Sequence, residues 1–468
     1  MRTYLHKIKY NHLVAILVSA FILCFLALYN RYPLTFNHDS GVYLENGFGG
    51  TVAYDRPILY GLFLYFSSLQ QTLWFSVITQ ALIVSLIIYY YFRYFAPASN
   101  FIPFYLGFTL LISFFMGGSF NVSWLMPDVF TPVCVLCMGL LLANELKVRD
   151  NIIISSLLVL SIGIHNSHFY ICMGLSLLLL IGFAFRSILK IYRVAGVRLK
   201  GIAFVMILII AGNLFVGAVH YMFEGRFKSS RGGSIFIMSN LIEMGIIDRY
   251  LTESCKEKNY ELCRYKDSLP NNFLWAENGP IYKTGGWEGN EKKYATIIKD
   301  MLMTPKYLRM FSYKSWVYTC KQFFNFDIVE VKVPSNRVNE AIAANYASAE
   351  SLRHSRSKQS TDSISFGFIN FAQNIVVAAC LVIYSLVFIF NKMTVRYRFF
   401  IAFILLSLIA NAWVCGTFSG VFPRYQIRVM WLLPLPLFLY LTEQFSQILI
   451  FKRFGTMPKP ESVRNETV

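Results

Sequence analysis

Long apolar stretches separated by short basic loops are the feature that most constrains how this chain folds. A bilayer core of about 30 Å needs roughly 20 apolar residues in each spanning helix, and about ten stretches approach that length. They cover residues 12–30, 68–92, 101–118, 129–145, 152–164, 169–185, 201–220, 367–390, 399–417 and 429–450. The fifth is short, so it is either a tilted or broken helix or half of a re-entrant pair with the sixth. Because only 15% of the residues are charged and 56% are hydrophobic, we predict an all-α polytopic membrane protein.

Lysine and arginine in the short loops predict the orientation of these spans. Basic residues precede the first span and follow the second, fourth, sixth, eighth and tenth. They are Arg2, Lys7, Lys9, Arg93, Lys147, Arg149, Arg186, Lys190, Arg193, Arg198, Lys200, Lys392, Arg396, Arg398, Lys452, Arg453 and Lys459. With ten spans, all of them lie on one side, which predicts a multi-pass protein of the cell (inner) membrane with both termini in the cytoplasm. Contact with anionic membrane lipids then explains much of the net charge of +18, without a nucleic-acid partner.

This topology divides the chain into three parts. We predict an N-terminal membrane module with an external loop, one mixed extracytoplasmic domain between the seventh and eighth spans, and C-terminal membrane helices with a short cytoplasmic tail. Their ranges are 1–220 with the loop at 31–67, then 221–366, then 367–468. Cys255 and Cys263 lie in the external domain, where an oxidising environment allows a disulfide, and the alternative is two free thiols. Cys134 and Cys137 have CxxC spacing, but they lie in an apolar helix without a second pair, which argues against a metal site.

Five groups of polar residues reach the outer face in this topology. They are Asp39 with Glu45, Asp55 and Arg56; Asp128; His165 and His168; Lys228 and Arg231; and Arg424 and Arg428. Charged residues beside a membrane span are costly and often mark a functional site. We therefore expect a substrate site on this face.

The two basic pairs favour an anionic ligand. Arg424 and Arg428 are four residues apart at the outer end of a helix, so we expect both guanidiniums to point the same way and to grip phosphate oxygens. Lys228 and Arg231 precede two glycines and form a second cationic turn, whose backbone amides would also face an anion. The alternative for this second pair is ordinary contact with lipid headgroups.

Each of the other polar residues has a structural alternative. Asp39 is either a catalytic residue, a solvated loop residue or the N-cap of the segment that follows it. Arg56, with the aspartate before it and the proline after it, is either a ligand residue or part of a turn into the next helix. His165 and His168 would share one face of a helix, as ligands of a phosphate or a divalent metal or as satisfied interfacial residues. Asp128 either binds substrate or caps the fourth span.

The sequence DSGVYL at 39–44, followed by YDRPILY at 54–60, resembles the first external loop of the GT-C superfamily of integral membrane glycosyltransferases. Members carry an acidic residue in a D-x-x-x-Y-L-like context and then a proline-containing segment that enters the next helix. The likeness extends over residues 37–64. Two features depart from the family pattern: the usual HP-P sequence reads DRPI here, and the soluble part lies between the seventh and eighth spans instead of at the C-terminus.

The resemblance implies an inverting transfer of a sugar from a polyprenyl-phosphate carrier to a glycan or lipid acceptor outside the membrane. It implies Asp39 as the general base, with the leaving phosphate stabilised by Arg424 and Arg428. The other candidate substrate-binding residues are Tyr43, Arg56, Asp128, His165, His168, Lys228 and Arg231. No cofactor is required by this scheme, although a divalent metal held by the histidines and Asp128 stays an alternative.

Two other functions share these features. One is an O-antigen or capsule polymerase, which uses lipid-pyrophosphate-linked glycans. The other is a flippase or transporter that binds the same headgroups without chemistry. The sequence has no P-loop, no HExxH, no GxSxG and no GxGxxG following a strand, which argues against ATP-driven transport, metalloproteolysis, hydrolase chemistry and a Rossmann-type sugar transferase.

Overall fold

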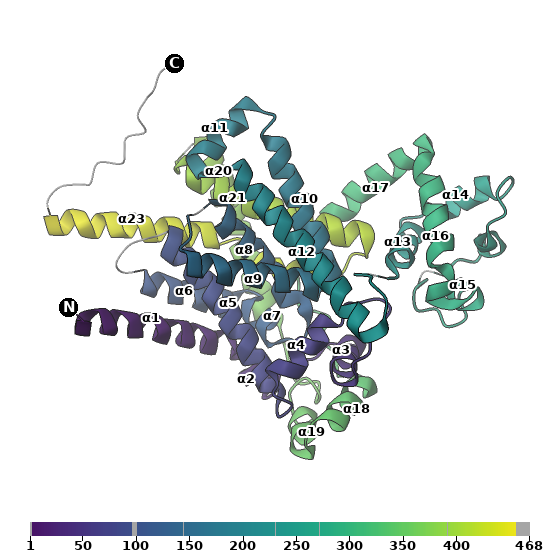
Figure 1. The fold of residues 1–468 in the computed structure, drawn as a ribbon, viewed down its shortest axis with the longest axis horizontal. Helices are drawn as coiled ribbons and strands as arrows, with labels where there is room; N and C mark the ends of the chain where they lie inside the picture. Colours follow the sequence, from purple (N-terminus) through teal and green to yellow (C-terminus); the bar gives the residue numbers. More distant parts are fainter. Residues whose placement is uncertain are drawn as a thin grey trace.

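In the residues that the computed structural model describes, the regular secondary structure is entirely helical (Figure 1). The described residues are 2–95, 101–143, 145–229, 231–270, 272–390 and 392–454. The prediction of an all-α protein is confirmed for them, and the external segment that was expected to be mixed is helical as well. The expected cytoplasmic tail after Phe454, with Lys459, lies outside the described residues.

Four helices in this part of the chain are long and apolar enough to cross a membrane. They are α5 (Leu73–Phe95), α12 (Leu199–Glu224), α20 (Gly367–Phe390) and α21 (Val395–Phe418). A fifth span arises if α10 (Asn166–Gly182) and α11 (Arg186–Ala195), which are bent by 114°, count as one. Shorter or less apolar helices lie at the other expected spans. They are α1 (Arg2–Leu23), α6 (Ile102–Phe115), the 3₁₀ turn η1 (Pro127–Val129) with α8 (Phe130–Ala143), α9 (Val148–Ile164) and α23 (Leu435–Phe454).

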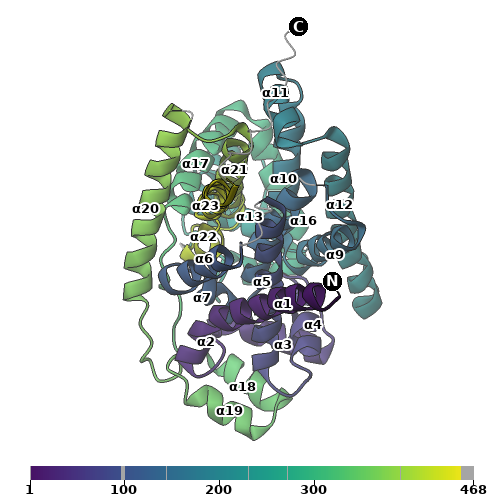
Figure 2. The same ribbon diagram turned by 90° about the vertical axis from the view of Figure 1, so that its left-hand side faces the viewer.

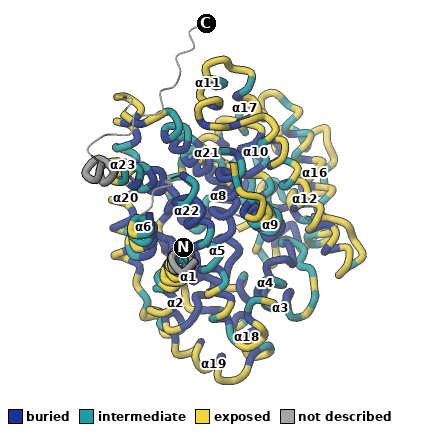
Figure 3. Tube along the Cα trace, turned by 60° about the vertical axis from the view of Figure 1, so that its left-hand side comes forward, coloured by how far each residue is buried: buried dark blue, intermediate teal, exposed yellow. Residues whose placement is uncertain are grey.

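The two ends of the molecule differ in character. α1 begins and α23 ends at one end, on the left of Figure 1. The opposite end holds α13 (Gly233–Glu243), α14 (Ile247–Ser254), η2 (Glu261–Tyr265), α15 (Pro280–Lys283) and α16 (Gly286–Met303). Seen from the first end, α20 and α12 flank the bundle on opposite sides (Figure 2). α8 lies in the middle and is buried from Phe130 to Leu140 (Figure 3), as expected of a helix that is apolar on every side.

The described residues form two hydrophobic cores. The smaller core joins α13 to α17 (Pro305–Phe323), and we call residues 233–323 the outer subdomain. The larger core joins the apolar helices and also takes in Val338, Ile342 and Tyr346 from the region of α18 (Asn336–Asn345) and α19 (Ser348–Ser355). The segment 221–366 that was expected to be one domain therefore contributes to both cores. The predicted disulfide between Cys255 and Cys263 is confirmed and lies in the outer subdomain.

A glycine contact fixes the two helices of the segment that was expected to form the first external loop. α3 (Asn37–Gly49) carries Asp39, Tyr43 and Gly47 at four-residue intervals, so the three residues share one face. Gly61 of α4 (Leu59–Ser67) packs on that face: a Cβ added to it would lie 2.6 Å from the Tyr43 carbonyl oxygen and 2.7 Å from the Gly47 nitrogen. Both neighbours are backbone atoms that cannot move aside, so the position of Asp39 depends on this close approach.

We expect Gly61→Ala to destabilise the protein by about 1–3 kcal/mol, because the added methyl group forces α3 and α4 apart. The measurement is the midpoint of thermal unfolding in detergent. Gly49→Ala is the control, since a Cβ there would meet nothing closer than Thr51 at 3.9 Å. Equal midpoints for the two variants would contradict the importance of the glycine contact.

Candidate functional site

A cavity of about 320 Å³ lies where α3, η1, the start of α10, α13, the end of α21 and α22 (Pro423–Met430) meet. Three arginines and three aspartates line it together with a histidine and several aromatic residues. Seven of the ten predicted site residues belong to its lining. They are Asp39, Tyr43, Arg56, Asp128, His165, Arg231 and Arg424. The remaining three, His168, Lys228 and Arg428, are not part of the lining.

Asp39 lies between two guanidiniums in this cavity. Its Oδ1 is 3.0 Å from Arg56 Nη1, and its Oδ2 is 2.9 Å from Arg424 Nη1. Burial alone raises the pKa of Asp39, but Arg56 and Arg424 outweigh this effect and hold the pKa of the carboxyl below its usual range. The carboxylate is therefore ionised at neutral pH. The alternative that Asp39 is the N-cap of α3 is wrong, because that position is taken by Phe36.

Arg56 and Arg424 each retain a donor that makes no hydrogen bond with the described residues. Arg56 donates two hydrogen bonds to Asp55, and its guanidinium lies 5.1 Å from the centre of the Tyr43 ring. Arg424 donates through Nη1 to Asp39 and through Nη2 to the Tyr425 hydroxyl. Arg56 Nη1, which is only ion-paired, and Arg424 Nε are buried without a hydrogen-bond acceptor. Buried charged donors of this kind favour an anionic ligand in the cavity.

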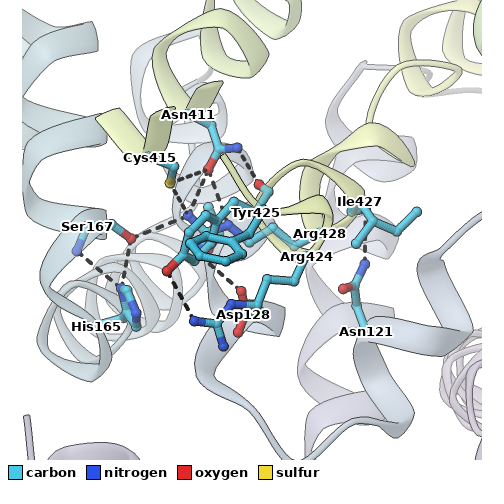
Figure 4. A network of polar contacts seen from close by, with 12 residues as sticks. Asn121, Asp128, His165, Ser167, Asn411, Cys415, Arg424, Tyr425, Ile427 and Arg428 are labelled. Carbon is cyan, nitrogen blue, oxygen red and sulfur yellow. Dashed lines mark hydrogen bonds and ion pairs between the residues drawn. The ribbon is translucent and has the colours of Figure 1, made fainter. Parts of the chain in front are cut away.

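Arg424 lines the cavity but Arg428 does not, so the expectation of a paired clamp is wrong. Arg428 is fully buried, and it donates to Asp128 at 3.1 Å and to Asn411 at 2.9 Å (Figure 4). The two guanidiniums lie 4.8 Å (Arg424) and 5.3 Å (Arg428) from the Tyr425 ring centre. Arg428 lies one helical turn deeper, where α22 packs against α21. Its charge is therefore used in contacts within the protein and is not offered to a ligand. Asp128 is its counter-ion and is not the cap of the fourth span.

The two histidines also differ from the expected arrangement. His165 precedes α10 and caps it, because its Nδ1 accepts a hydrogen bond from the Ser167 backbone N–H at 3.2 Å. The proton of the neutral ring is therefore on Nε2. Burial, followed by His168 and Arg428, lowers the pKa of His165 well below its usual value, so this residue is a neutral hydrogen-bond donor at the cavity.

His168 lies inside α10 and is 1% exposed. Its two ring nitrogens are 2.7 Å from Thr131 Oγ1 and 2.6 Å from the Ser161 carbonyl oxygen, so neither is available to a substrate. Across the described residues, no three His, Cys, Asp or Glu side chains are placed to hold a metal ion together.

The second predicted cationic turn is split by the structure. Arg231 lines the cavity, donates to Glu224 at 2.8 Å and lies 5.0 Å from the centre of the Tyr54 ring. Lys228 has an exposed side chain, and only its backbone makes hydrogen bonds: the N–H donates to the Arg226 carbonyl oxygen and the carbonyl oxygen accepts from His220. Of this pair, Arg231 alone is placed to meet a ligand in the cavity.

Several residues of the site were missed by sequence reasoning. Glu330 accepts a hydrogen bond from the backbone N–H of Arg424 at 2.8 Å, and burial raises the pKa of Glu330 against the lowering effect of that arginine. Asn411 orients Arg428, and its signal was a polar residue inside an apolar helix. Trp275 lines the cavity from a loop of the outer subdomain, and no local pattern indicates it.

No protein-family model, no curated protein and no solved structure matches this chain.

Proposed function

We propose that the chain is an integral membrane glycosyltransferase. It moves a sugar from a polyprenyl-phosphate carrier to a glycan or lipid acceptor on the extracytoplasmic face. The observation that carries the proposal is the ionised Asp39 carboxylate held between Arg56 and Arg424 in one cavity. A base beside two phosphate-binding side chains is what such a transfer needs.

The proposed topology has ten spans with both termini in the cytoplasm of the cell (inner) membrane. Two observations support it. Helices occupy all ten expected stretches, and α1 begins and α23 ends at the end of the molecule opposite the outer subdomain (Figure 1). The basic loops then lie in the cytoplasm, and the cavity lies toward the extracytoplasmic side.

The charge balance of the cavity favours a monophosphate donor. Arg56 and Arg424 face Asp39 and Asp55 in the lining, and Arg231 is paired with Glu224. The third lining aspartate, Asp128, is already paired with Arg428. The guanidiniums are therefore largely compensated before a ligand binds. A phosphodiester with one negative charge adds less repulsion to Asp39 and Asp55 than a pyrophosphate would. The charge balance therefore favours a sugar linked through one phosphate over the lipid-pyrophosphate donor of a polymerase.

The residues present can carry out an inverting transfer. Asp39 accepts the proton of the acceptor hydroxyl, whose oxygen forms a bond to the anomeric carbon while the bond from that carbon to the phosphate oxygen breaks. The electron pair leaves with the carrier phosphate, where Arg424 Nε and Arg56 Nη1 are the available donors. His165 adds a neutral N–H donor at the cavity. The carboxylate still has lone pairs for this role, because each oxygen holds only one guanidinium.

The outer subdomain provides the wall that would meet the acceptor. Trp275, Phe236 and Ile237 line the cavity from this side, and Trp275 is 55% exposed. We expect Trp275→Ala to raise the KM for the acceptor roughly 3- to 10-fold with little change in kcat, because it removes a stacking face worth about 0.5–1.5 kcal/mol. Steady-state kinetics measure this effect. Trp275→Phe keeps an aromatic face and is the control, and equal KM values for all three proteins would contradict an acceptor role for this wall.

The proposal is tested with the purified full chain in nanodiscs. The donors are polyprenyl monophosphates that carry one labelled hexose or pentose, and the acceptors are membrane glycolipids extracted from bacterial cells. The expected result is release of polyprenyl phosphate together with transfer of the label to an acceptor. If labelled donors bind but polyprenyl phosphate is never released, the enzyme proposal fails.

A further inference from the structure

Helix α17 has an exposed aromatic face that neither core covers. The buried side of the helix packs inward through Tyr307, Ser315 and Tyr318. The opposite side exposes Tyr313 by 66% and Trp316 by 64%, and Phe324, directly after the helix, is 69% exposed. Large aromatic side chains exposed together usually mark an interaction surface.

The same helix is strongly basic. It carries Lys306, Arg309, Lys314 and Lys321, and it has no aspartate or glutamate. Lys306 is paired with Glu253, whereas Arg309 and Lys314 form no ion pair with any residue that the structure describes. Lysine and arginine normally concentrate on the cytoplasmic side, so a basic helix in an external segment is not explained by topology alone. Its charge favours an anionic partner.

Contacts with α21 indicate where this face lies. Ser315 Oγ is 2.8 Å from Thr417 Oγ1, and it accepts a hydrogen bond from Trp413 Nε1 at 2.9 Å. The two helices touch closely, because a Cβ added to Gly416 would lie 2.8 Å from the Tyr318 carbonyl oxygen. α21 is long and apolar enough to span a membrane, and the crossing point falls in its final turns. The crossing point is therefore at the membrane boundary, where tyrosine and tryptophan accumulate.

We infer that α17 is an interfacial helix that binds anionic phospholipid on the outer leaflet. Tyr313, Trp316 and Phe324 enter the boundary between headgroups and acyl chains, and Arg309, Lys314 and Lys321 contact the headgroup phosphates. This contact holds the outer subdomain, and with it the Trp275 wall of the cavity, at a fixed height above the bilayer. The inference depends on a membrane-spanning α21 whose final turns lie on the outer side, as in the proposed topology, and not on the proposed sugar transfer.

The test places the full chain in nanodiscs of phosphatidylcholine alone or with added phosphatidylglycerol. Amide hydrogen exchange of residues 305–323 is followed in both. Phosphatidylglycerol is expected to slow exchange in α17, and high salt is expected to reverse the effect. The triple variant Arg309→Gln/Lys314→Gln/Lys321→Gln should lose it, because each basic residue near an anionic surface contributes about fivefold in affinity.

The matched control is Lys256→Gln/Lys292→Gln/Lys299→Gln, which removes the same charge from exposed positions of the outer subdomain outside α17. It should keep the full phosphatidylglycerol effect. The inference is overturned if α17 exchanges equally fast in the two kinds of disc. It is also overturned if the triple variant and its control lose the phosphatidylglycerol effect to the same extent. Trp316→Ala keeps every charge and tests the aromatic part separately. It should speed exchange of α17 in both discs, and unchanged exchange would count against insertion of this face.

Discussion

Asp39→Asn is expected to lower the rate of sugar transfer by about 10²- to 10⁴-fold, the usual contribution of a general base. Asparagine has nearly the same shape but cannot take the acceptor proton. Binding of polyprenyl phosphate should stay equal or become tighter, because Arg56 and Arg424 are no longer neutralised by the carboxylate. Turnover and polyprenyl-phosphate binding are measured on the same preparation. A fall in rate without a fall in affinity separates a proton acceptor from a residue that only positions the arginines.

Asp55→Asn is the matched control for this prediction. Asp55 lines the same cavity and pairs with Arg56 at 2.6 Å, yet it is not a counter-ion of Arg424. We expect its loss to cost much less turnover. If Asp39→Asn keeps full activity while Arg424→Ala abolishes it, the polymerase alternative gains. If the Asp39→Asn and Arg424→Ala variants both move labelled lipid across the membrane, and no phosphate is released, the flippase alternative gains.

Asp128→Ala is expected to destabilise the protein by about 3–5 kcal/mol, because it leaves the fully buried Arg428 without its counter-ion. Asn411 and Ser167 still accept from the guanidinium, but neither carries a charge to balance it. The measurement is the midpoint of chemical unfolding in detergent. The loss of stability should appear in the absence of any substrate, because the buried ion pair between Asp128 and Arg428 forms without a ligand.

The control is the double variant Asp128→Leu/Arg428→Met, which removes both charges and fills the same space with apolar side chains. Replacing a buried ion pair in this way is often neutral, so most of the lost stability should return. If Asp128→Ala unfolds at the wild-type midpoint, the buried pair does not stabilise the protein as described. If the double variant is no better than the single one, the cost comes from lost packing and not from the uncompensated charge.

Much of the architecture was predictable because it follows from the length of the apolar stretches and from the basic loops between them. The helical class and the disulfide between Cys255 and Cys263 are confirmed. The meeting of Asp39 and Arg424, 385 residues apart in the chain, was also within reach, since topology alone brings their segments to one face. What topology cannot supply is the direction of a side chain within that face.

Arg428 and His165 illustrate this limit. A four-residue spacing predicts that two arginines share a helix face, but it does not show that the deeper turn of α22 packs against Asn411 and Asp128. Likewise, a three-residue spacing predicts neighbouring histidines on one helix face. The two rings do lie 5.3 Å apart, but the helix begins only after His165, which becomes its cap. Contacts with distant segments determine where the side chains of Arg428 and His165 lie. A single sequence does not reveal those contacts.

The most direct test of the central claim is a cryo-EM structure of the full chain in a nanodisc with polyprenyl phosphate, the carrier that every donor of this class would release. The account predicts density for the phosphate in the cavity, within hydrogen-bond distance of Arg424 and Arg56 and beside the Asp39 carboxylate. Phosphate bound elsewhere on the protein, with Arg424 still paired only to Asp39 and the cavity empty, would contradict it.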